Sequence, residues 1–324
     1  MIGAIIGDIC GSPYEWFPEK DKSAIQMIHP KSKFTDDSVC TIAITRWLQG
    51  DGDLARTMKD LCIKHLERGY GLDFLHWVIE DKPEPYGSWG NGAAMRVSTV
   101  PYFATSIAHA ADLAKQSADI THNHWEGVRG AQATAVAGRM ALEGWTKAEI
   151  KNAISRIYGY DLERTPDEVR ERYYFEVSCQ KTVPEAIICF LHCENYEDTI
   201  KTAISLGGDA DTVACIAGGI AGAYYQKIPG HLYKLINEKL TPDLMEDVRW
   251  FEHEYARRTY ERTSPDALAT WIEPEKPAYN PAAGEHEKYM AEMDKIEGFL
   301  ATQRPAQKPI WTRWAGLLRR TLRI

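Results

Sequence analysis

The sequence has no long hydrophobic run. No segment of about 18 consecutive apolar residues occurs, which excludes a transmembrane helix. The N-terminus lacks a basic region, and its first apolar run is interrupted by Asp8, so no secretory signal peptide is expected. Basic residues are not in excess either, because the net charge of the 324 residues is -8. Since nucleic-acid-binding surfaces normally carry a basic excess, we expect a cytoplasmic protein whose main partner is not a nucleic acid.

Strand patterns are also rare. Alternating runs rich in β-branched side chains are hard to find, whereas apolar residues recur with helical spacing along most of the chain. The expected helices are 36–49, 54–66, 106–119, 127–143, 147–158, 184–193, 196–205, 211–226 and 242–260. We predict an all-α fold, with a single compact domain of roughly a dozen or more helices over residues 1–262.

Two of these helical segments, residues 127–143 and 212–223, are dense in alanine and glycine. Small side chains allow the axes of packed helices to approach closely. We therefore expect these helices to lie at the centre of the domain, where the residues at their N-terminal ends can form a site.

The cysteines do not suggest a disulfide framework. Their number is odd, seven, and they are scattered along the chain. In a reducing compartment they are expected to be small buried side chains. Cys189, His192 and Cys193 can share a helical face, which hints at a soft-metal site, but they lie in an apolar run that favours core packing.

The amino-acid composition changes near residue 263, and we predict a separate C-terminal extension over residues 263–324. It begins as a proline-rich linker or arm, continues as a charged helix at about 284–300, and ends in a basic, aromatic tail around Trp311 and Trp314. Such an amphipathic tail can dock on an anionic membrane surface. We favour a contact with the acidic face of its own domain or with another subunit.

Two acidic clusters stand out in the first domain. One is Thr35-Asp36-Asp37, and the other contains Asp209, Asp211 and Thr212 after a Gly-Gly pair. Each cluster precedes an apolar helical pattern, so helix capping is one interpretation. Ligation of a hard divalent cation is the other, because oxygen-only donors select Mg²⁺, Mn²⁺ or Ca²⁺ over zinc. The residues alone favour the two interpretations equally.

Three further segments carry potential binding groups. Gly87–Gly92 offers backbone N–H groups without bulk, as close approach to a diphosphate requires, although a glycine-rich loop alone is often just a turn. His122 and His124 precede the alanine-rich helix, where a histidine can also cap the helix or be a satisfied buried imidazole. We favour that structural interpretation for His124. Glu15, in the N-terminal segment, is by itself expected to be an ordinary surface acid.

Taken in order, these segments resemble the ADP-ribosylglycohydrolase family, of the dinitrogenase reductase-activating glycohydrolase and ADP-ribosyl-acceptor hydrolase type. The resemblance rests on residues 3–15, the two acidic clusters, residues 87–96 and residues 121–124, and it covers roughly residues 1–260. It implies an all-α fold with two Mg²⁺ or Mn²⁺ ions in a cleft. The implied metal ligands are Thr35, Asp36, Asp37, Asp209, Asp211 and Thr212.

The resemblance also implies the roles of the other residues. Glu15 matches the mobile glutamate of the family, and Glu15, Asp36 and Asp37 are the candidates for polarising a water molecule or relaying its proton. The implied substrate-binding residues are Ser88, Trp89, Gly90, Asn91, Gly92 and His122. No role is carried over to Trp16 or Trp125, because family members differ most around these loops.

The implied function is hydrolysis of the bond at the anomeric carbon of an ADP-ribosyl group, most often on modified arginine of a protein. Serine-linked, polymeric or small-molecule conjugates are an alternative that the same site would serve. A catalytically silent ADP-ribose-binding or structural relative is another, since fold does not guarantee activity. A two-metal phosphohydrolase is a remoter alternative that rests only on the acidic residues.

Overall fold

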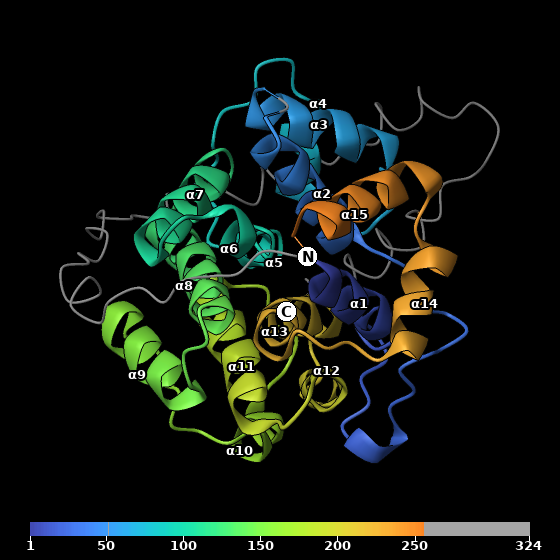
Figure 1. Cartoon of the computed structure of the whole chain (residues 1–324). Helices are drawn as coiled ribbons and strands as arrows, with labels where there is room; N and C mark the ends of the chain where they lie inside the picture. Colours follow the sequence, from blue (N-terminus) through green and yellow to red (C-terminus); the bar gives the residue numbers. More distant parts are fainter. Residues whose placement is uncertain (51, 256–324) are drawn as a thin grey trace, which may run out of the picture.

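The computed structural model describes residues 1–50 and 52–255, and this part of the chain contains fifteen α-helices, one short 3-10 helix and no β-strand (Figure 1). The predicted all-α fold is confirmed. The helices are α1 (Ile2–Gly11), α2 (Asp36–Leu48), α3 (Leu54–Lys64), α4 (Leu72–Ile79), α5 (Gly92–Met95), α6 (Val100–Phe103), α7 (Ile107–Asp119), α8 (Trp125–Leu142), α9 (Lys147–Tyr158), α10 (Pro166–Arg172), α11 (Cys179–His192), α12 (Tyr196–Ser205), α13 (Ala210–Tyr225), α14 (Gly230–Lys239) and α15 (Pro242–Tyr255), and the 3-10 helix η1 is Lys22–Ala24.

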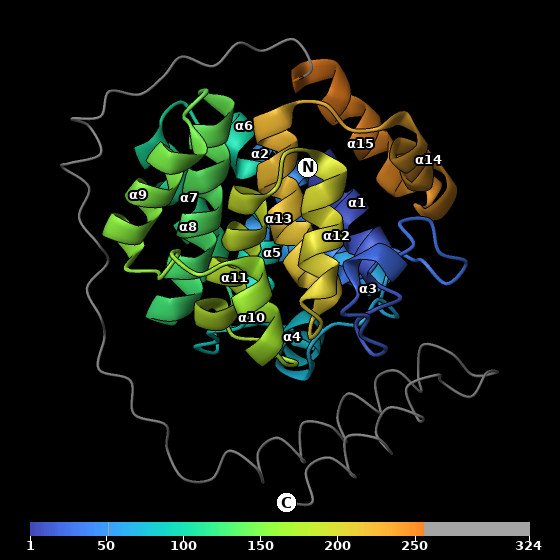
Figure 2. The same ribbon diagram turned by 90° about the horizontal axis from the view of Figure 1, so that it is seen from below.

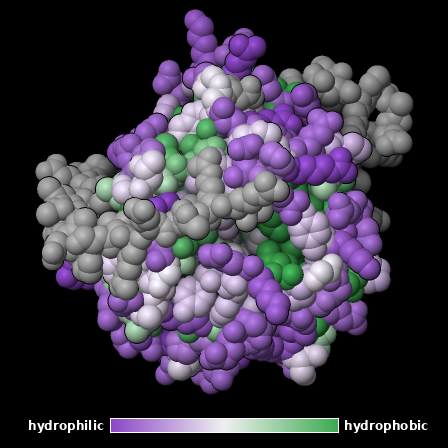
Figure 3. All heavy atoms as spheres, viewed as in Figure 1, coloured by the Kyte–Doolittle hydropathy of each residue, from purple (hydrophilic) through white to green (hydrophobic). Residues whose placement is uncertain are grey.

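The small-residue helices lie in the interior, as predicted. Figure 2 shows α13 in the middle of the molecule, with α1, α11 and α12 around it. Nearly every side chain of α8 and α13 is buried. On the face drawn in Figure 3, by contrast, hydrophilic side chains cover most of the surface and hydrophobic ones gather in small areas. The apolar residues therefore build one central core.

Helices α1 and α13 pack backbone against backbone in antiparallel directions. A Cβ atom added to Gly3 would lie 2.2 Å from the carbonyl oxygen of Gly218, and one added to Gly7 would lie 2.1 Å from that of Ala214. At Gly11 the added atom would lie 2.5 Å from the Cα atom of Asp211. The C-terminal end of α1 therefore meets the N-terminal end of α13, where the second acidic cluster begins.

We expect Gly7→Ala to destabilise the protein by about 3 kcal/mol, because the extra methyl group forces two packed backbones apart. The measurement is denaturant unfolding followed by circular dichroism. Gly230→Ala is the matched control, since a Cβ atom at Gly230 meets nothing within 4 Å. An unchanged unfolding midpoint for Gly7→Ala would show that the two helices separate without cost.

The predicted helix boundaries are mostly within a few residues of the observed ones, with one larger error. The helix expected at 184–193 begins at Cys179, so that Pro184 lies inside it rather than at its start. A proline inside a helix removes one backbone hydrogen bond, and α11 accommodates Pro184 in its second turn nevertheless. The helices α1, α4, α5, α6, α10 and α14 were not predicted.

Some predictions lie outside the described residues. The extension over residues 263–324, with its linker, charged helix and tail, is among them, as is the end of the helix expected at 242–260. The proposed division into two parts therefore stays a prediction. Among the residues that the structure describes, no helix is long and apolar enough to cross a membrane.

Candidate active site

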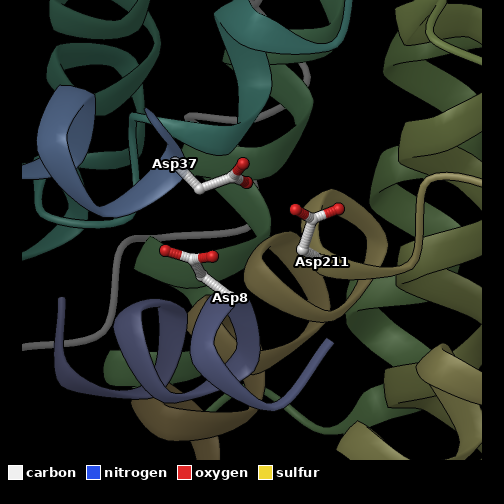
Figure 4. A group of neighbouring side chains, drawn as sticks. All are labelled: Asp8, Asp37 and Asp211. Carbon is white, nitrogen blue, oxygen red and sulfur yellow. The ribbon is translucent and has the colours of Figure 1, made fainter. Parts of the chain in front are cut away.

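Three helix ends bring three carboxylates together. Asp8 comes from α1, Asp37 from the first turn of α2, and Asp211 from the first turn of α13. Figure 4 shows the three carboxylates directed toward one another, and one oxygen of each lies within 4.8 Å of the others. All three residues are buried. The antiparallel packing of α1 on α13 is what makes Asp8 and Asp211 neighbours.

A second group adjoins the first and shares one of its members. Ligand atoms of Glu15, Asp209 and Asp211 also lie within 4.8 Å of one another. Asp211 therefore belongs to both groups. The structure thus joins the two acidic clusters of the sequence, and it places Glu15 beside them.

Helix capping explains only part of these clusters. The Thr35 hydroxyl caps α2 by accepting the N–H of Asp37. Asp209 occupies the corresponding position of α13, but its side chain makes no capping hydrogen bond. Within the described part of the chain, Oδ1 of Asp37 is buried without a hydrogen-bond partner. A buried carboxylate oxygen without a hydrogen-bond partner is costly, and a cation held between these residues would satisfy it.

The hydroxyls of the two clusters face the same carboxylate. Thr35 Oγ1 lies 3.2 Å and Thr212 Oγ1 lies 3.3 Å from Oδ2 of Asp37. Asp36 lies at the edge, half-buried, with its backbone N–H donating to the carbonyl of Arg68 at 2.9 Å. Asp36 is not a member of either close group of carboxylates in the described residues. Its role as a metal ligand stays a prediction.

Asp8 is the site residue that the sequence reasoning missed. Its carboxylate accepts hydrogen bonds from the backbone N–H and hydroxyl of Thr35 and from the backbone N–H and hydroxyl of Ser38. These bonds fix the start of α2 against α1. The available signal was a single acidic residue within an otherwise apolar helix, because a buried charge needs partners.

The acidic groups of the site are buried close together, so that their negative charges repel one another. Burial and the neighbouring carboxylates raise the pKa values of Asp36, Asp37 and Asp211 well above the ordinary range. Burial raises the pKa of Asp8 to about 6, against the effect of its hydrogen bonds. For Glu15, burial and then the charge of Asp209 raise the pKa to about 8. Hard oxygen donors that repel one another in a buried cluster fit a divalent cation such as Mg²⁺ or Mn²⁺.

The glycine-rich loop lies beside the acidic groups. The Asn91 side-chain amide donates to Oδ2 of Asp209 at 2.6 Å, which links the loop directly to the cluster. The hydroxyl of Ser88 accepts the N–H of Gly90, and Gly90 forms a β-bridge with Ser178. Trp89 is 39% exposed, so this ring is available at the surface.

His122 lies under the glycines of this loop, whereas the His124 ring packs edge-on against Trp89, with ring centroids 5.6 Å apart. A Cβ atom at Gly92 would lie 3.1 Å from Nε2 of His122, and one at Gly90 would lie 3.4 Å from the same atom. Burial, and then the nearby Arg96 guanidinium, lower the pKa of His122 well below the usual value, so that its imidazole is neutral. His124 instead caps α8 by accepting the N–H of Glu126, which confirms the structural interpretation of this residue.

The soft-metal interpretation of the cysteine-rich segment is not supported. Cys189 is fully buried in the core, and the Nδ1 atom of His192 lies 3.0 Å from the carbonyl oxygen of Ile188. The thiol of Cys193 donates to Thr202. The two buried cysteines agree with the predicted core packing, whereas His192 is exposed and does not.

Comparison with known proteins identifies the family. The family model described as ADP-ribosylglycohydrolase matches residues 1–266 of the chain. The chain belongs to the ADP-ribosylglycohydrolase family. The resemblance inferred from the motifs is thereby confirmed, and the matched region contains both acidic groups, the glycine-rich loop and His122.

Relatives of this ADP-ribosylglycohydrolase family member come from animals and bacteria. Human ADP-ribosylhydrolase ARH3 is 28% identical over 306 residues, which cover 69% of this chain and 84% of that protein. The ADP-ribosyl-[dinitrogen reductase] glycohydrolase of Rhodospirillum rubrum is 26% identical, covering 69% of this chain and 84% of its own. The ADP-ribosylarginine hydrolase Tri1 of Pseudomonas putida (strain GB-1) is 23% identical, covering 78% of this chain and 74% of its own.

The fold agrees with that of a solved structure. A chain of an ADP-ribosylglycohydrolase-related protein complex superimposes with a TM-score of 0.56 at 25% sequence identity. The alignment covers 73% of this chain and 93% of the other. The all-α architecture described above is therefore that of the family.

Proposed function

We propose that the protein releases ADP-ribose from ADP-ribosylated protein, with arginine as the modified residue. Family membership supports the reaction class. The observation that carries the proposal is the arrangement of the acidic residues. They form two clusters of three carboxylates that share Asp211, and Asn91 of the glycine-rich loop donates a hydrogen bond to Asp209 in one of them. A site of this kind offers anionic oxygens at one end and, at the other, a loop whose glycines leave room for a ligand.

Two Mg²⁺ or Mn²⁺ ions are the proposed cofactors. A divalent cation bound there would supply positive charge for the hydroxyls of the distal ribose and would lower the pKa of a water molecule. The residues that would hold the two ions are Thr35, Asp36, Asp37, Asp209, Asp211 and Thr212. Asp8 would keep Thr35 and the first turn of α2 in place through its hydrogen bonds.

Glu15 is the proposed general base. Hydrolysis breaks the bond between C1 of the ribose and the side-chain nitrogen. The oxygen of water bonds to C1, and the proton that water loses passes through Glu15 to the leaving nitrogen. Glu15 is less buried than Asp37 and lies beside Asp209 and Asp211, so its carboxylate is placed to take a proton from a water molecule at the acidic cluster. Nearby carboxylate oxygens stabilise the positive charge that develops at C1.

The diphosphate would lie along the glycine-rich loop. The proposed contacting residues are Ser88, Trp89, Gly90, Asn91, Gly92 and His122. Glycine at positions 90 and 92 keeps the space above His122 open, because any side chain there would point at the imidazole.

The main proposal and its alternative differ in the group to which C1 of the ADP-ribose is attached. One relative is named as an ADP-ribosylarginine hydrolase, which supports arginine. The more similar ARH3 relatives carry no linkage in their names. Serine-linked, polymeric and small-molecule conjugates are the second candidate substrates, because the acidic site would act on the same ribose in each of them.

The test is incubation with arginine-, serine- and O-acetyl-linked ADP-ribose, with release of free ADP-ribose as the readout. We expect the arginine conjugate to be hydrolysed fastest. EDTA should abolish the activity, and Mg²⁺ or Mn²⁺ should restore it. Full activity in metal-free buffer would contradict the metal site, and inactivity on every conjugate would identify a catalytically silent relative.

We expect Gly92→Val to weaken binding of ADP-ribose about tenfold or more, because the branched side chain crowds His122 and fills the space left for the phosphates. Isothermal titration calorimetry measures this directly. Gly71→Val is a suitable control, since a Cβ atom at Gly71 meets nothing within 4 Å. Unchanged affinity of the Gly92 variant would disprove the phosphate-loop assignment.

A further inference from the structure

Four exposed aromatic side chains lie on two segments that meet in space, and we call this set the aromatic rim: Trp16, Phe17, Tyr174 and Phe175. Their exposed fractions are 44%, 75%, 75% and 50%, respectively. Trp16 stacks on Phe175 with ring centroids 5.1 Å apart, so that two segments distant in the sequence contribute to the rim. Clustered exposed aromatic side chains are typical of interaction surfaces.

The rim is continuous with the candidate active site. Trp16 directly follows Glu15. The carbonyl oxygen of Tyr174 would lie 2.6 Å from a Cβ atom on Gly208, the residue before Asp209. At the other end of the segment, the carbonyl of Val177 accepts the N–H of Asn91 at 2.7 Å. Residues 173–177 therefore run from the acidic cluster to the glycine-rich loop, with the rim at their surface.

The size of the rim favours a short polypeptide over a second copy of this chain. A fully exposed aromatic side chain contributes about 150–250 Å², so the exposed fractions give the rim roughly 500 Å². A stable protein–protein interface needs about 800 Å² on each partner. Lysine side chains border the rings, with Lys20 Nζ 5.4 Å from the Tyr174 centroid and Lys31 Nζ 5.7 Å from that of Phe17.

We propose that the aromatic rim binds the polypeptide that carries the ADP-ribosylated side chain. This inference rests on the proposed function, which divides the substrate into an ADP-ribosyl group and the protein attached to its C1 atom. The acidic groups and the glycine-rich loop take the ADP-ribosyl group. The attached protein leaves the site past Glu15 and thus crosses Trp16 and its neighbours. The rim gives the enzyme a preference for modified proteins over free conjugates.

The test compares kcat/KM for an ADP-ribosylated protein and for free ADP-ribosylarginine in the double variant Phe17→Ala, Tyr174→Ala. We expect a loss of about tenfold or more on the protein substrate, equivalent to about 1.4 kcal/mol, and less than about twofold on the free conjugate. Trp250→Ala is the matched control, because Trp250 is 38% exposed on α15, outside the segments of the rim. It should change neither value.

Three results would overturn the inference. Equal losses on both substrates would assign the rim to the ADP-ribosyl group or to stability. No loss on the protein substrate would leave the rim without a role in recognition. A change in molecular mass by light scattering, with activity unaltered, would assign it to self-association. Inactivity of the unaltered protein on every conjugate would instead overturn the proposed function, and the rim assignment with it.

A chain of buried hydrogen bonds leads independently to a second inference, which concerns His122. Arg96 is 1% exposed, and its Nη2 atom donates to Oγ1 of Thr121 at 2.9 Å. Oγ1 of Thr121 lies 2.7 Å from Nδ1 of His122. A guanidinium group only donates, so the threonine oxygen accepts from Arg96 and its own proton is free to bond Nδ1. In the neutral ring the remaining proton is then on Nε2.

The geometry assigns Arg96 and Thr121 as positioning residues that hold His122 in the Nε2–H form, with this donor directed at the glycine-rich loop. Nε2 is the ring atom nearest to the added Cβ positions of Gly90 and Gly92. A phosphate oxygen above the loop would find a fixed donor there. This inference rests on the proposed function and deepens it, because it explains why His122 can donate a hydrogen bond to the phosphates of ADP-ribose.

The test uses Thr121→Val, which keeps the shape of the side chain and removes the hydroxyl, with Thr121→Ser as the conservative control. We expect ¹⁵N NMR of the His122 ring to show the Nε2–H form in the unaltered protein and in the serine variant, and a mixture in the valine variant. Affinity for ADP-ribose should fall about fivefold in the valine variant only.

An unaltered tautomer in Thr121→Val would overturn the assignment, as would equal loss of affinity in both variants. The NMR readout needs no ligand, so failure of the unaltered protein to bind ADP-ribose would count against the proposed function alone.

Discussion

Asp211→Asn is expected to reduce turnover at least about a hundredfold while the helical fold persists. Loss of an outer hydrogen-bond partner of a metal ligand already costs about 10–100-fold, and Asp211 is a proposed ligand shared by both carboxylate groups. Asparagine keeps the volume and removes the charge. The measurement is the initial rate with saturating Mg²⁺, together with circular dichroism of the variant.

We expect Asp211→Asn to raise the stability of the metal-free protein, although it lowers turnover. Asp211 is buried beside other carboxylates whose charges oppose its ionisation. Removing this group relieves repulsion, so the melting temperature in EDTA should rise, whereas Mg²⁺ should stabilise the variant less than the unaltered protein. Asp60→Asn, at an exposed position on α3, is the control. Activity above about a tenth of the original would be incompatible with a shared ligand, given the losses above.

Glu15→Gln should lower kcat about 10²–10⁴-fold and leave the affinity for ADP-ribose nearly unchanged, as loss of a general base predicts. Glutamine has the size of glutamate, so the shape of the site is kept while the proton acceptor is lost. Stopped or continuous assays give kcat, and calorimetry gives the affinity. Glu19→Gln is the control, because the Glu19 carboxylate accepts the backbone N–H of Asp21 instead of facing the cluster. If kcat were unaltered by Glu15→Gln, the proton acceptor would have to be another group.

Helical periodicity predicted the amphipathic helices well, because each of them has one apolar face. It failed for α1, in which every residue from Gly3 to Gly11 is buried and no face is distinguished. The four-residue helices α5 and α6 are too short for a period to develop. The tight packing of small residues could still be inferred from composition, and it correctly placed α8 and α13 in the interior.

The candidate site was predictable to the extent that it lies in local clusters. Both clusters begin helices, and their residue types alone left helix capping and hard oxygen ligation equally favoured. The contribution of Asp8 could not be predicted in this way, because it depends on the antiparallel packing of α1 against α13. That packing joins segments about 200 residues apart in the sequence. The sequence shows that Gly7 is small, but only the structure shows that its partner is the backbone at Ala214.

The pairing of α1 with α13 also bears on how the protein is made. Asp8 and Asp211 are separated by about 200 residues, and synthesis at about 5–20 residues per second takes roughly 10–40 s to cross that interval. During that time the newly made N-terminal segment has none of its three glycine contacts with α13 and exposes apolar side chains outside the ribosome. The core and the candidate site are therefore completed together, only after α13 has been made. Chaperones that hold the nascent N-terminus should therefore raise the yield of active protein more than they raise the yield of total protein.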